Sequence, residues 1–319
     1  AATIEEAGRV HCTVTMSRRA PAMPAVRVLP PSADATGTRT PTRVFLLTLL
    51  SLLAFAANSL LCRLALKSES IDPASFAAIR RASGAAMLGV VMRARGVSPV
   101  AHGSWAAAAW LFAYAITFSF AYVVLPAGVG ALLLFGAVQA TMIGAGLWRG
   151  ERLASRQWRA VPLAMGGLVA LLLPGLSAPP LGSAALMLVA GVGWGAYSLH
   201  GKKALDAGAA TAGNFVRAVP FAVLLVVVCF TQSSISGAGL GYALCSGVVT
   251  SGMGYIIWYT VLPRLRSSAA ATVQLSVPLL AALGGTVFLG EDWTQRLGWT
   301  GLAILGGIAL VVWAPKKAV

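Results

Sequence analysis

The sequence predicts an all-α polytopic membrane protein, with ten transmembrane helices arranged as two inverted five-helix repeats. Of its 319 residues, 58% are hydrophobic and only 10% are charged, whereas about a quarter of the residues in a soluble domain carry charge. Long uncharged runs alternate with short basic groups, and motifs from the first half of the chain return in the second. Composition therefore predicts a membrane location, and repetition predicts how the helices are organised.

The uncharged runs define the expected helices in chain order. Residues 44–62 are long enough to cross a hydrocarbon layer of ~30 Å, and residues 74–92 form the next helix. The run 103–148 is expected to turn at Pro126, the run 160–199 at residues 174–182, and the run 218–263 at residues 231–239, which gives two helices from each. The last two helices are expected over residues 267–289 and 296–314.

An ordered set of short motifs occurs twice, at an offset of 137 residues that becomes 140 further along. The set comprises Tyr-x-x-Leu-Pro at Tyr122 and Tyr259, Gly-Glu ending at Glu151 and Glu291, and Gly-Gly at Gly166 and Gly306. Such a set is typical of an internal duplication. It predicts five-helix units over residues 43–176 and 177–316, preceded by a disordered cytoplasmic extension over residues 1–42, which is rich in Ala, Pro, Thr and Arg.

The basic residues between the helices predict the orientation. If the N-terminus is cytoplasmic, the inner loops hold most of the flanking arginines and lysines, and the outer loops hold only Arg63, Lys67 and Arg296. Because positive charge is retained in the cytoplasm, both termini are expected there, with the helices in the lipid bilayer of a bacterial inner membrane. Five crossings per unit place the second unit upside down, as in many secondary transporters.

The motifs resemble those of the drug/metabolite transporter superfamily and, within it, of the EamA-type family. The resemblance spans residues 44–314 and is carried by Trp194-Gly195, Lys202, Arg80, Arg217, the Leu-Pro turns, Pro278 and the Gly-Glu pairs. It implies that helices 1, 3, 4, 6, 8 and 9 surround a substrate cavity. The first unit departs from the pattern at Ala57-Asn58 and Val138, so we expect an asymmetric cavity.

All nine acidic residues lie in the N-terminal tail, a loop or a helix end. Proton-driven exporters of cations use a carboxylate inside the membrane, so proton coupling of that kind is not expected. The sequence has no Walker-type phosphate loop, so ATP is not expected to drive the protein, and we expect no enzymatic activity, cofactor or metal site. Because the basic residues form no continuous stripe, nucleic acid is not an expected partner.

Uncharged polar and aromatic residues in the cavity helices are the candidate substrate contacts. They are Asn58, Ser59, Gln139, Trp194, Tyr197, Tyr255 and Gln274. These side chains offer stacking surface and hydrogen bonds without fixed charge, which predicts a neutral or zwitterionic, amino-acid-like metabolite, with export as the family's commoner direction. For the two glutamines, bonding to a neighbouring helix is the alternative.

Two arginines leave a second hypothesis open. Arg80 and Arg217 lie about two turns into the second and seventh helices, close enough for a long side chain to extend to the membrane interface. Alternatively, one of them binds a carboxylate or phosphate of an anionic substrate. Arg81, about 100° further around the helix, is expected at the interface. A channel is a weaker alternative, and a monomer and a homodimer are both compatible with the sequence.

Overall fold

The computed structural model describes residues 40–150, 155–173, 175, 178–201, 204, 206–229, 234–261, 264–265 and 273–313. Within these ranges every named element is helical, which confirms the all-α prediction, and an isolated β-bridge joins Ile71 to Ile235. The extension expected over residues 1–42 lies outside the described residues, except that residues 40–42 already belong to the first helix.

The helices are α1 (Thr40–Lys67), α2 (Pro73–Ala94), η1 (Pro99–Ala101), α3 (Trp105–Tyr122), α4 (Ala127–Trp148), α5 (Ser155–Leu172), α6 (Leu181–Gly201), α7 (Ala207–Val228), α8 (Gly237–Cys245), η3 (Ser246–Met253), α9 (Gly254–Val261), α11 (Ser276–Leu289) and α12 (Gln295–Trp313). The elements α8, η3 and α9 follow one another without a break, and η3 is π-helical. They therefore form one rod.

Several helices begin at a side-chain cap. Asp72 precedes α2 and accepts a hydrogen bond from the backbone N–H of Ser75, while Pro73 occupies the first helical position. Asp206 caps α7 in the same way, and Ser104 and Ser236 cap α3 and α8. These residues explain why the helices start where they do, because each cap satisfies an N–H group that has no partner inside its helix.

Six of the described helical segments are long and apolar enough to cross a membrane: α1, α3, α4, α6, α7 and the α8–η3–α9 rod. The stretches Ala160–Leu172 in α5 and Ser276–Leu289 are apolar but shorter. Helix α2 is less hydrophobic because it carries Arg80 and Arg81 near its middle. The prediction of a multi-pass membrane protein is confirmed.

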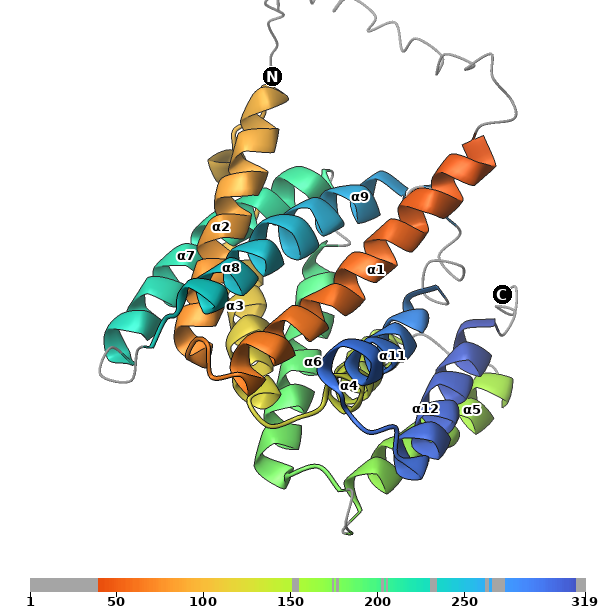
Figure 1. Cartoon of the computed structure of the whole chain (residues 1–319). Helices are drawn as coiled ribbons and strands as arrows, with labels where there is room; N and C mark the ends of the chain where they lie inside the picture. The colour runs from red at the N-terminus through yellow and green to blue at the C-terminus, as the bar shows by residue number, and fades with distance from the viewer. Residues whose placement is uncertain are drawn as a thin grey trace, which may run out of the picture. The chain divides into compact units, whose positions relative to one another are not determined.

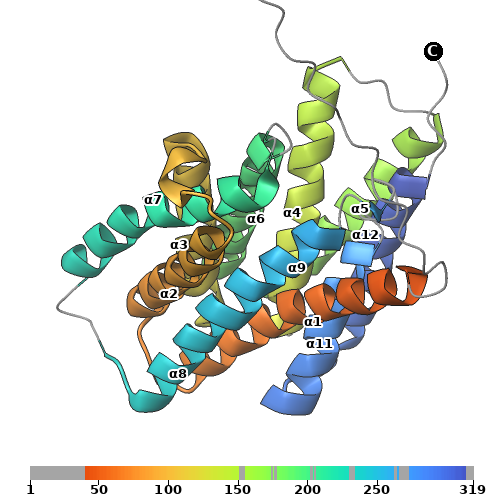
Figure 2. The same cartoon turned by 90° about the horizontal axis from the view of Figure 1, so that it is seen from above.

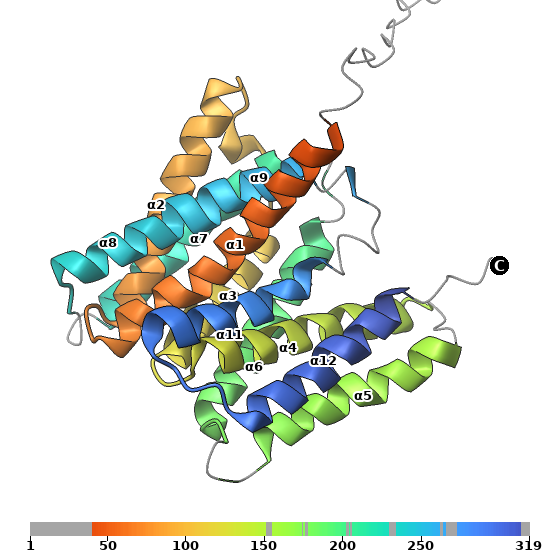
Figure 3. The ribbon, with the colours of Figure 1, turned by 45° about the vertical axis from the view of Figure 1, so that its right-hand side comes forward.

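Helices from the two halves of the chain pack against each other. Helix α2 packs on α7, α4 on α11, and α5 on α12. The α5–α12 pair lies at one flank of the bundle and the α2–α7 pair at the opposite flank (Figure 1, Figure 2). In Figure 3, α11 and α4 lie between α1 and the α5–α12 pair.

Glycines make the α5–α12 contact close. A Cβ atom on Gly167 would lie 3.0 Å from the backbone N of Ile304, and one on Gly307 would lie 2.6 Å from the backbone N of Ala164. The absence of a side chain lets the two backbones approach, as in many membrane helix pairs. Gly167 and Gly307, and likewise Ala164 and Ile304, are separated by the repeat offset of 140 residues, so the contact is reciprocal.

Candidate functional site

A cavity lies in the middle of the bundle, between the two halves of the chain. It is lined by Phe55, Asn58, Ser59, Arg80, Tyr114, Phe118, Leu134, Phe135, Trp194, Thr250, Ser251, Tyr255 and Gln274. These residues come from α1–α4, α6, η3, α9 and the residues just before α11. The free volume of about 40 Å³ holds a few water molecules at most. A metabolite therefore enters only if the helices move apart.

The structure brings five of the seven predicted substrate contacts to this cavity, namely Asn58, Ser59, Trp194, Tyr255 and Gln274. It does not bring the other two. Tyr197 lies behind Trp194, and its hydroxyl donates to Thr211 on α7 at 3.2 Å. Gln139 lines a separate pocket between α4, α5 and α12. Gln139 and Gln274 thus have different surroundings, although the sequence predicts the same role for both.

Asn58 connects α1 to η3. Its side-chain oxygen accepts hydrogen bonds from the hydroxyls of Ser246, at 2.8 Å, and Thr250, at 3.2 Å. A carboxamide buried among helices needs such partners, because an unpaired polar group costs about 1–3 kcal/mol. Asn58 therefore holds two helices together at the edge of the cavity.

Aromatic rings form one continuous wall of the cavity. The ring of Trp194 lies 5.0 Å from Tyr114, 5.4 Å from Tyr255 and 5.5 Å from Tyr197, measured between centroids. Tyr255 also packs 5.8 Å from Phe215 behind it. Rings at these separations attract each other and resist displacement, so the wall presents a stable apolar surface with hydroxyl groups at its margin.

Arg80 lies inside the bundle and lines the cavity, with 1% of its surface exposed. Its Nε donates to the hydroxyl of Ser251 at 3.1 Å and its Nη2 to that of Tyr114 at 3.2 Å, while Nη1 is buried without a hydrogen-bond partner. The expectation that this side chain extends to the membrane interface is wrong, because α3 and η3 enclose it.

Arg81 is also buried, with none of its surface exposed, so the expectation of an interfacial position is wrong. Its guanidinium carbon lies 4.7 Å from the ring centroid of Phe215, and its Nε, Nη1 and Nη2 have no hydrogen-bond partner. Burying an unpaired cation costs on the order of several kcal/mol. A desolvated cation–π contact contributes about 2 kcal/mol. The ring therefore offsets only part of the cost.

Arg217 occupies a different environment, although it stands at the position that corresponds to Arg80 at the repeat offset of 137 residues. Its Nη1 donates to the backbone carbonyls of His102 and, at 3.2 Å, Gly213, and its Nη2 donates to that of Val100 at 2.9 Å. Arg217 thus holds the loop between α2 and α3, and the structure does not bring it to the cavity.

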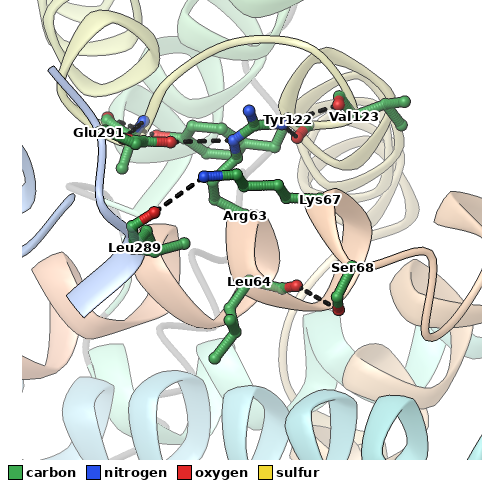
Figure 4. Close-up of polar contacts among 9 residues, drawn as sticks. Arg63, Leu64, Lys67, Ser68, Tyr122, Val123, Leu289 and Glu291 are labelled. Atoms are coloured by element: carbon green, nitrogen blue, oxygen red, sulfur yellow. Dashed lines mark hydrogen bonds and ion pairs between the residues drawn. The ribbon is translucent and has the colours of Figure 1, made fainter.

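A cluster of polar contacts lies at the end of the bundle where α1 terminates (Figure 4). Nε of Arg63 pairs with Glu291 at 3.0 Å, and its Nη1 donates to the carbonyl of Val123 at 2.7 Å. The other carboxylate oxygen of Glu291 accepts the N–H of Ala127 at 2.8 Å, at the start of α4. We call Arg63, Glu291 and these backbone groups the end clamp. It explains why α1 extends past residue 62, because Arg63 bonds to other elements instead of ending the helix.

Comparisons with known proteins identify relatives of this chain. The profile described as the EamA-like transporter family matches residues 181–313. The uncharacterized protein PA1977 of Pseudomonas aeruginosa is 55% identical over 276 residues, which is 86% of this chain and 96% of that protein. The uncharacterized transporter YwfM of Bacillus subtilis is 29% identical over 79% of this chain and 88% of its own length.

The chain belongs to the EamA-like transporter family. A solved structure titled "Crystal structure of protein" shares this fold, with a TM-score of 0.58 at 20% identity over 83% of this chain and 98% of that one. The resemblance inferred from the motifs is thereby confirmed, and with it membership of the drug/metabolite transporter superfamily. The protein is a membrane transporter of the EamA family.

Four aromatic residues of this EamA-family cavity were missed by the sequence interpretation, namely Phe55, Tyr114, Phe118 and Phe135. Tyr114 and Phe118 line the cavity, and Tyr122 follows them at the same spacing of four residues on α3. Residues four apart share a face of a helix, so this stripe was available as a signal.

Proposed function

We propose that this protein is a secondary transporter that moves a small zwitterionic, amino-acid-like metabolite across the bacterial inner membrane by alternating access. Export is the direction that the family resemblance implies. The observation that carries the proposal is the central cavity, which is lined both by Arg80, whose Nη1 is unpaired, and by the aromatic wall around Trp194. The two relatives described above come from bacteria, which supports the membrane that we name.

The two sides of the cavity suit the two ends of a zwitterion. The free N–H groups of Arg80 pair with a carboxylate, for which a guanidinium is the preferred partner. The rings of Trp194 and Tyr255 attract an ammonium group through their faces and pack against an apolar side chain. Gln274 adds an amide that can donate or accept. A neutral metabolite would leave Arg80 unpaired, so we favour the zwitterion.

An anionic metabolite is the second candidate, and the buried guanidinium of Arg81 favours it. The residues that would bind the anion differ from those expected from the sequence, which were Arg80 and Arg217. Arg217 donates to backbone carbonyls instead, so the second positive charge near the cavity comes from Arg81, which follows Arg80 on α2.

Two inverted five-helix units with ten crossings are part of the proposal. In a pair of units related by a twofold axis, elements near the axis contact their own counterparts. The packing of α2 on α7, α4 on α11 and α5 on α12 supports this arrangement, as does the reciprocal contact of Gly167 and Gly307 across α5 and α12. Inverted repeats are the usual basis of alternating access.

The two ends of the bundle differ in a way that supports alternating access. The end clamp closes the side that we assign to the periplasm, where Arg63 and Glu291 pair. At the opposite end, a hollow of about 480 Å³ lies between the end of α2, the start of α7 and α9. The arrangement therefore corresponds to a carrier closed to the outside.

Transport in this proposal needs no proton-binding carboxylate in the membrane. The acidic residues that the structure describes, Glu69, Asp72, Asp206, Glu291 and Asp292, lie at helix ends or in loops. We expect that a pH difference imposed across proteoliposomes will not by itself drive substrate accumulation. Accumulation against a gradient under that condition contradicts the mechanism.

The substrate assignment is tested by counterflow in proteoliposomes loaded with individual amino acids and related metabolites. With an active substrate found, Gln274→Ala is expected to lower transport about fivefold or more, because a lost hydrogen bond costs on the order of 1 kcal/mol or more. Gln139→Ala is the matched control, since it removes the same side chain from a different pocket. Equal effects of the two substitutions, or no effect of Gln274→Ala, would contradict the assignment of this cavity as the substrate site.

A further inference from the structure

Arg80 and Arg81 place two positive charges next to each other inside the bundle. Their guanidinium carbons lie 5.5 and 5.8 Å from the ring centroid of the same residue, Tyr114. Both side chains are fully buried, and four of their nitrogens lack a hydrogen-bond partner. Two like charges near the same ring repel each other, and a medium of low dielectric constant strengthens the repulsion. Burying this pair of arginines therefore lowers the stability of the fold unless another group compensates for it.

The described residues supply no negative charge to offset it. Within the described residues, the one ion pair joins Arg63 to Glu291, in the end clamp. The rings of Phe215 and Phe118 lie against the two guanidinium groups and reduce the cost, but a ring accepts no strong hydrogen bond. The described residues therefore leave these nitrogens without an acceptor.

We propose that Arg80 and Arg81 form an anion-binding site beside Tyr114, which takes one small anion with the chemistry of a carboxylate or a halide. A single anion between the two guanidinium groups adds two attractions that outweigh the one repulsion, and it accepts hydrogen bonds from several of the four unpaired nitrogens. The anion is either an inorganic ion resident in the protein or the carboxylate of the transported molecule. In the second case the inference rests on the proposed function.

The anion has to be small. Arg81 is enclosed by α2, α3 and α7 and is not among the residues that line the central cavity, whereas Arg80 is. An anion that meets both side chains therefore lies at the inner margin of the cavity, beyond the aromatic wall. Bulky anions such as gluconate do not fit such a position.

The test is the melting temperature of the purified full-length protein in detergent. Sodium chloride or sodium acetate is titrated against sodium gluconate at constant ionic strength, so that general screening is held fixed. Because a ligand that binds only the folded state stabilises it in proportion to the logarithm of its concentration, we expect a rise of several degrees with one of the two small anions.

Arg81→Met is expected to abolish this rise, since it keeps a similar volume without the charge. It is also expected to fold, because apolar replacements of buried charges are often tolerated. Arg93→Met on the same helix is the control: Arg93 is exposed, and its removal changes the net charge equally. If Arg81→Met does not fold, Arg81→Lys retains the charge without the planar fork, and should require at least tenfold more anion for the same rise.

The outcomes are distinct. A rise with chloride that Arg81→Met loses identifies an inorganic anion, and a rise confined to acetate identifies a carboxylate. No rise in the wild type, or the same rise in Arg81→Met, overturns the site. Because this measurement needs no transported substrate, the anion site and the transport proposal succeed or fail separately.

Discussion

Arg80 and Arg81 show how strongly one residue position on a helix determines a side chain's surroundings. Arg80 reaches the central cavity and hydrogen bonds to α3 and η3, whereas Arg81 stacks on Phe215 of α7. Tyr114 serves both, because its hydroxyl accepts from Arg80 and its ring lies near each guanidinium group. It is therefore a residue on which the environment of both cations depends.

Tyr114→Phe tests that dependence. The substitution keeps the ring but removes the acceptor from a buried cation, and hydrogen bonds to charged groups contribute about 1.5–3 kcal/mol. We expect a lower denaturation midpoint in detergent. Tyr242→Phe is the control, because that hydroxyl makes no hydrogen bond among the described residues, and it should leave the midpoint unchanged. A Tyr114→Phe protein as stable as the wild type contradicts this account of Arg80.

Among the helices, η3 packs closely against the site. It lies on α2, where a Cβ atom on Gly247 would come within 2.6 Å of the carbonyl oxygen of Arg80. The π-helical turn and the missing side chain together let the two backbones meet. This contact places Ser251 of η3 where it accepts from Arg80.

Gly247→Ala is expected to destabilise the protein by about 1–3 kcal/mol, because overpacking a close helix contact forces the backbones apart. Gly241→Ala lies on the same rod with no atom within 4 Å of its would-be Cβ, so it should be neutral or stabilising. Melting temperatures of the two variants, measured side by side, give the comparison. Equal shifts in the same direction would refute the packing argument.

The end clamp is the second element whose role can be tested. Glu291→Gln removes the charge that pairs with Arg63, whereas Asp292→Asn makes the same change at an exposed neighbour. With native cysteines replaced, we expect an impermeant maleimide to label Ser59→Cys several-fold faster from outside in the Glu291→Gln background only. If both backgrounds label at the wild-type rate, the clamp does not close the bundle.

At the scale of the whole molecule, the proposed orientation makes a direct prediction. Ser234, beside α8, is expected outside, and Ser98, between α2 and α3, is expected in the cytoplasm; both are exposed. In intact cells, an impermeant thiol reagent should label Ser234→Cys and leave Ser98→Cys unlabelled until the membrane is permeabilised. The reverse pattern means that the whole orientation is inverted.

Properties that can be read along the sequence, namely hydropathy, helix caps and motif order, determined the membrane helices, where several of them begin, and the family. Hydropathy predicts membrane helices because each must satisfy its own backbone polar groups, and this requirement needs no knowledge of the neighbours. Caps such as Asp72 and Asp206 are equally local. The motif order around Trp194 and Glu291 was sufficient to predict the family, because duplicated and inherited residues keep their order along the chain.

The tertiary structure alone decided which residues meet. Gln139 and Gln274 look alike in the sequence, yet only Gln274 lines the cavity, because different helices cover the faces on which they lie. Arg81 was expected at the interface because the sequence of a single helix does not show which of its faces other helices cover. Its burial follows from the packing of α3 and α7 against α2. Side-chain surroundings depend on contacts between residues far apart in the chain, and packing determines those contacts only once all the helices are in place.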